Sequence, residues 1–86
     1  MKKFEIINNK WIKMIYSGKE FSNIALVAIK IDDISKIDCK SPSTSYGHIH
    51  LYGHSSDISV EFIYEIEELN QFNEDLGFFK KLLALE

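Results

Sequence analysis

The 86-residue sequence contains no arginine. All ten basic residues are lysines, and the formal net charge is -3. Arginine carries the planar, two-pronged group with which proteins most often hold phosphates and guanine bases. The absence of arginine, together with the net negative charge, argues against a nucleic acid as the partner.

Cysteine and long apolar runs are also scarce. The single cysteine, Cys39, cannot close a disulfide within the chain, which is typical of proteins kept in a reducing compartment. No apolar run approaches the roughly 18 residues of a membrane helix, and the first residues do not read as a secretion signal. We therefore expect a cytoplasmic protein that makes no membrane contact.

The chain has enough apolar residues for one small core, since 45% of it is hydrophobic and 13% is aromatic. At this length we expect a single domain over residues 1–86. The charge is divided unevenly. Residues 1–40 carry eight lysines and five acids, about +3, and residues 41–86 carry two lysines and eight acids, about -6.

Six segments have the alternation or the β-branched composition of strands. They are residues 2–7, 11–16, 24–31, 35–40, 47–53 and 57–64. Segment 11–16 also fits a short helix capped by Asn9 and ended by Gly18, but the strand is favoured. The residues that we expect in the core of the sheet are Val27, Ile29, Ile58, Val60 and Phe62.

From Glu65 onward the apolar residues recur at intervals of three and four, which predicts a helix over about 65–85. Gly77 leaves open a kink near 73–77. We expect an α+β fold in which a small antiparallel β-meander of four to five strands packs against this C-terminal α-helix. The Asp32-Asp33-Ile34 bend and the strand order resemble hairpin patterns of small bacterial PH-like or flagellar-regulator-like proteins, a resemblance that implies no activity.

Three histidines offer a candidate metal site. His48 and His50 are two residues apart on an expected strand and therefore project from the same face, as paired imidazole ligands do. His54 follows closely, and Asp57 or Cys39 are further candidate ligands. The spacing has low specificity, and three histidines on a solvated sheet face are the alternative interpretation.

No constellation predicts an enzyme. Cys39 can be paired on paper with Asp38 and a histidine, but no local motif marks an activated thiol. The alternation points Cys39 inward together with Ile37, so we expect its side chain to be buried. The four glycines are scattered and form no phosphate-binding loop. Glutamates at the expected helix start are explained by the helix dipole. We expect neither catalysis nor a cofactor.

The end of the expected helix carries two apolar stripes. The core-facing stripe consists of Leu76, Phe79 and Leu83. The second stripe, rotated by about 100°, consists of Phe78, Leu82 and Leu85. One sheet face cannot readily cover both, so we expect the second stripe to contact another chain. The alternative is that the N-terminal segment, with Trp11, covers this stripe.

The sequence therefore predicts a small, non-enzymatic protein-binding domain. It would act through self-association or by masking a partner protein, as phage-type inhibitors, immunity proteins and accessory proteins do, with acidic residues meeting a basic surface. The candidate partner-binding residues are Phe78, Leu82, Glu61, Glu65, Glu67, Glu68, Glu74 and Asp75. The alternative function is metal binding through His48, His50 and His54.

Overall fold

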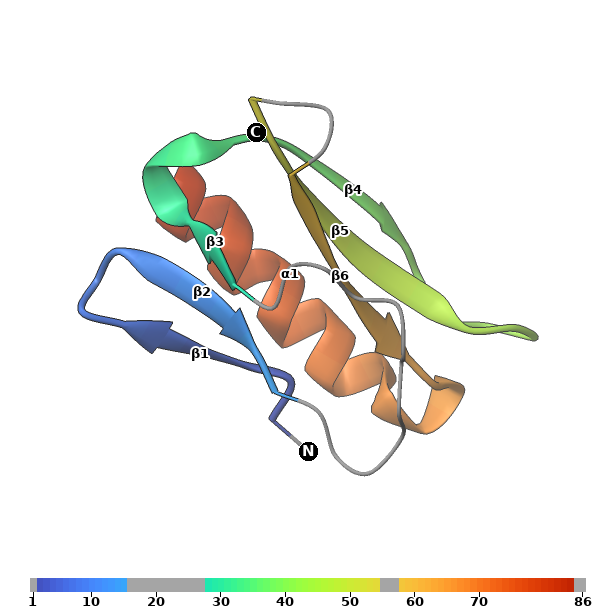
Figure 1. Ribbon diagram of the computed structural model, residues 1–86. Coiled ribbons are helices and arrows are strands. Elements are labelled where there is room, and N and C mark those ends of the chain that lie inside the picture. The colour runs from blue at the N-terminus through green and yellow to red at the C-terminus, as the bar shows by residue number, and fades with distance from the viewer. Residues whose placement is uncertain (1, 16–27, 55–57, 85–86) are drawn as a thin grey trace.

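The computed structural model describes residues 2–15, 28–54 and 58–84. In this part of the chain, six strands form two antiparallel sheets of three strands each, and one helix follows them (Figure 1). The predicted α+β class with a C-terminal helix is confirmed. The strand arrangement differs from the prediction, because the structure has two small sheets in place of one meander of four to five strands.

The first sheet has the order β1-β2-β3, with β1 at Phe4–Ile7, β2 at Trp11–Met14 and β3 at Ala28–Lys30. Asn8 and Asn9 join β1 to β2 with positive φ angles of 53° and 57°. Two consecutive left-handed residues form the hairpin turn that matches the natural twist of the strands. The expected strand over 11–16 thus has a hairpin partner in β1, and its residue 16 lies outside the described residues.

The second sheet has the order β4-β5-β6, with β4 at Ile34–Lys40, β5 at Gly47–Gly53 and β6 at Ser59–Tyr64. A short 3-10 helix, η1 (Ile31–Asp33), leads into β4. The loop between β4 and β5 closes tightly, and a Cβ atom at residue 47 would collide with the backbone of Lys40 and Pro42. Glycine at this position is therefore a requirement of the hairpin.

The helical part begins with a 3-10 turn, η2 (Ile66–Glu68), and continues as α1 (Leu69–Leu83). The α-helix thus starts four residues later than the sequence predicts. It runs unbroken through Gly77, which is exposed and has no atom within 4 Å of an added Cβ position. Among the described residues, no helix is long and apolar enough to cross a membrane.

One cluster of buried side chains joins both sheets to α1. Its members are Phe4, Ile12, Met14, Ile29, Ile34, Ile49, Leu51, Val60, Phe62, Tyr64, Phe72 and Phe79. Of the expected core residues, Ile29, Val60 and Phe62 are buried and Ile58 is partly buried, while Val27 lies outside the described residues. Three aromatic rings, Phe4, Phe62 and Phe79, lie 4.5 to 5.7 Å apart between centroids and connect β1, β6 and α1.

Candidate protein-binding surface

The flank of α1 that carries Phe78 and Leu82 is an exposed apolar surface on this small molecule. Phe79 is fully buried and Phe72 nearly so, because their side of the helix faces the sheets. Phe78 and Leu82 lie one helical turn apart on the adjacent flank, where 43% and 38% of these residues remain exposed. Leu85, the third member of the predicted stripe, lies outside the described residues.

The ring of Phe78 is held in place by two other rings. It stacks on Phe4 of β1 at 5.7 Å and an interplanar angle of 28°, and it meets Phe79 edge-on at 5.9 Å. The N-terminal segment therefore reaches this stripe through Phe4. The part of the alternative interpretation that assigned this contact to Trp11 is wrong, because Trp11 points away from the core side of the first sheet and is 41% exposed. The rest of the Phe78 ring stays open to solvent.

Two of the predicted partner-binding acids form the start of the helical segment. Glu65 and Glu68 make a reciprocal capping box, in which each carboxylate accepts a hydrogen bond from the backbone N–H of the other. The Glu68 carboxylate also pairs with the Lys3 ammonium at 2.8 Å. Partial burial by itself raises the pKa of Glu68, but the backbone hydrogen bond and Lys3 outweigh it, so the pKa is lowered. These contacts explain both acids structurally.

Asp75 is also engaged within the molecule. The Tyr64 hydroxyl donates a hydrogen bond of 2.7 Å to the Asp75 carboxylate. Burial raises the pKa of Asp75 even though this hydrogen bond opposes the rise. Burial, followed by the bond to Asp75, raises the pKa of Tyr64 as well. The pair ties α1 to β6 and leaves Asp75 poorly placed for a partner.

The remaining predicted acids are exposed but do not form one patch. Glu67 lies in η2 and Glu74 on α1, whereas Glu61 lies on the outer face of β6, with its carboxylate 3.7 Å from His50 Nδ1. Only Glu74 lies beside the apolar flank, since it precedes Phe78 by one helical turn. The structure thus separates the acidic set that the sequence grouped together.

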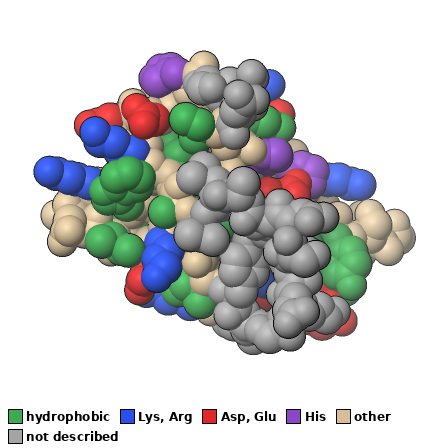
Figure 2. All heavy atoms as spheres, in the orientation of Figure 1, with side chains coloured by type: hydrophobic (Ala, Val, Ile, Leu, Met, Phe, Trp, Pro, Cys, Tyr) green, Lys and Arg blue, Asp and Glu red, His purple; other side chains and the backbone are tan. Residues whose placement is uncertain are grey.

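The histidines are not gathered into a ligand set. His48 and His50 share the outer face of β5, and the His50 ring stacks on Tyr52 at 4.1 Å. His54 follows the end of the strand, about 13 Å from His50 at roughly 3.3 Å per residue. Figure 2 accordingly shows histidine side chains at two separate places. Among the described residues, no group of three His, Cys, Asp or Glu side chains is placed to hold a metal ion.

Cys39 departs from its predicted environment. Its register partner is Ile49, so it lies on the core side of the second sheet, as the alternation indicates. It is nevertheless exposed, because β4 is an edge strand with a neighbouring strand on one side alone. The expectation of a buried Cys39 is wrong for this reason.

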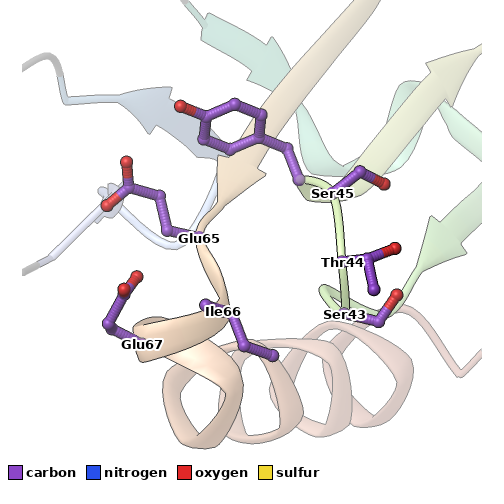
Figure 3. Close-up of a pocket in the computed structure, with 7 residues that line it drawn as sticks. Ser43, Thr44, Ser45, Glu65, Ile66 and Glu67 are labelled. Carbon is purple, nitrogen blue, oxygen red and sulfur yellow. The ribbon is translucent and has the colours of Figure 1, made fainter.

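Two surface features were not predicted from the sequence. One is a depression of about 290 Å³ between the β4–β5 loop and η2, lined by Ser43, Thr44, Ser45, Tyr46, Glu65, Ile66 and Glu67. Figure 3 shows Ile66 between its two walls. Ile66 is 47% exposed, because η2 does not continue the periodicity of α1. The lining contains no histidine, cysteine or lysine.

The other feature is the outer face of the first sheet. Trp11 lies opposite Lys30 in the register, and Lys13 follows two residues later on the same side. Figure 2 shows hydrophobic and lysine side chains side by side at the left of the molecule. The alternation of residues 11–14 in the sequence indicates that Trp11 and Lys13 share an outer face. It does not indicate that β3 pairs with β2 and places Lys30 beside Trp11.

No protein-family model, no curated protein and no solved structure matches this chain.

Proposed function

We propose that this chain is a non-enzymatic protein-binding domain that acts through self-association or by masking a partner protein. The apolar flank of α1, defined by Phe78 and Leu82, is its contact surface. The observation that carries the proposal is the exposure of these two neighbouring apolar residues, at 43% and 38%, on a helix whose adjacent side already packs Phe72 and Phe79 into the core.

Preorganisation supports this choice of surface. Phe78 is fixed by its ring contacts with Phe4 and Phe79, so little side-chain freedom is lost when its open side is covered. Rigid aromatic residues with an exposed side are common anchors of protein interfaces. Leu82, one turn further on, extends the apolar area along the helix.

Site-specific photo-crosslinking tests the proposal in cells that produce the protein. A benzophenone amino acid replaces Leu82 in one variant and Ile63 in a matched control, because Ile63 has nearly the same exposure, 37%, on the outer face of β6. We expect a discrete crosslinked product from position 82 and none from position 63. A product of twice the 10.0 kDa chain mass indicates self-association, and another discrete mass indicates a masked partner. No product from position 82, or the same products from both positions, contradicts the proposal.

A further inference from the structure

The apolar flank of α1 is bordered by two opposite charges. On a helix with 100° per residue, Glu74 and Lys81 both project about 40 to 60° beyond Phe78, on the solvent side. Both residues are exposed, and neither takes part in an ion pair among the described residues. They are seven residues apart, about 10 Å along the axis, so they are too far apart to pair with each other.

This pattern is self-complementary. Suppose that two copies of α1 lie antiparallel about a two-fold axis that passes close to Phe78. Residue 74 of one helix is then level with residue 82 of the other helix, and Lys81 of that second helix is next to residue 82. Glu74 of each copy then lies opposite Lys81 of the second copy, and the two Phe78 rings meet at the centre. A two-fold contact of this kind uses the same surface on both subunits.

We infer that the partner of this flank is a second copy of the same chain, bound antiparallel through Phe78 and Leu82 and flanked by two Glu74–Lys81 pairs between the copies. The inference rests on the proposed function and specifies its partner. The flank is small compared with the roughly 800 Å² per partner of a standard interface. The dimer is therefore weak and exchanges with monomer, and its charged rim makes it weaker at high salt.

Reversing the charges of Glu74 and Lys81 tests the antiparallel arrangement of the two helices. Sedimentation velocity is measured up to about 1 mM for wild type, Glu74→Lys and Lys81→Glu, each alone. We expect wild type to dimerise, and each variant to dimerise at least about tenfold more weakly, because each places like charges opposite each other twice. An equimolar mixture of the two variants restores opposite charges at both pairs and should dimerise within about threefold of wild type. A single chain that carries both Glu74→Lys and Lys81→Glu should also dimerise within about threefold of wild type.

Lys80→Glu is the matched control. Lys80 lies in the last turn of α1, as Lys81 does. Reversing its charge therefore has the same effect on the helix dipole as Lys81→Glu, but Lys80 projects from the other side of the helix. We expect no change in dimerisation. Far-UV circular dichroism checks the folding of each variant, and Glu74→Gln and Lys81→Gln provide milder changes that should weaken the dimer less.

The outcomes separate this inference from the proposed function. A wild type that stays monomeric at about 1 mM overturns the dimer, while a crosslink from position 82 to a protein of different mass leaves the binding function standing. A dimer that Leu82→Ser weakens but the charge variants do not overturns the antiparallel arrangement. The antiparallel arrangement is also overturned if the equimolar mixture of Glu74→Lys and Lys81→Glu dimerises no better than each variant alone.

Discussion

Replacing Phe62 by alanine should bring the protein close to its limit of stability. Phe62 is 2% exposed, and its ring lies 5.7 Å from the Phe4 ring and 5.6 Å from the Phe79 ring, between centroids. Removal of a fully buried phenylalanine typically costs about 3 to 5 kcal/mol. A chain of this length is expected to have about 4 to 13 kcal/mol of stability, at roughly 0.05 to 0.15 kcal/mol per residue. The loss is thus a large part of the total, because one ring links β1, β6 and α1.

Urea denaturation followed by circular dichroism measures this loss. Phe62→Leu should cost less, roughly 1 to 2 kcal/mol, since fewer buried atoms are removed, and it remains measurable if Phe62→Ala does not fold. Ile63→Thr, on the exposed side of the same strand, is the control and should change stability by less than about 0.5 kcal/mol. An unchanged midpoint for Phe62→Ala would show that the assignment of inner and outer faces on β6 is wrong.

Gly77→Ala should raise the free energy of unfolding by about 0.5 to 1 kcal/mol, because the site is helical and unobstructed; a decrease in the thermal midpoint would refute this. Tyr64 has a pKa above its usual value in the folded state, so it stays protonated while the unfolded chain ionises, and stability should fall as pH rises above about 10. Tyr64→Phe should lessen that fall, and an identical pH profile for both proteins would contradict the role of burial. Replacing His48 and His50 together by Thr should change stability by less than about 1 kcal/mol, whereas loss of bound zinc with a large drop in the midpoint would establish a structural metal site.

The fold class follows from the sequence because periodicity is a local property. Alternation marks β5 and β6, and the change of period after Glu65 marks the helix. Which strands pair is a non-local property, so the division into two sheets could not be derived from the alternation in single segments. The Asn8-Asn9 pair was a usable signal, since consecutive asparagines favour a left-handed hairpin turn.

The candidate site was only partly predictable for similar reasons. Helical periodicity places Phe78 and Leu82 on a flank of their own, but it does not show that Phe4 supports the Phe78 ring. The acids were grouped by composition, although Glu68 and Asp75 have partners within the fold, Lys3 and Tyr64. Glutamate is also an uncommon N-cap residue, so the sequence did not indicate that a 3-10 turn precedes α1.

We propose that two copies of the chain meet in solution through the Phe78–Leu82 flank of α1. Backbone amide chemical shifts, recorded by NMR over a dilution series of the wild-type protein, show whether this contact forms. We expect chemical-shift changes with concentration that are centred on residues 74–82 and are absent from the outer face of β6. Spectra that do not change with concentration, or changes confined to residues away from α1, would contradict it.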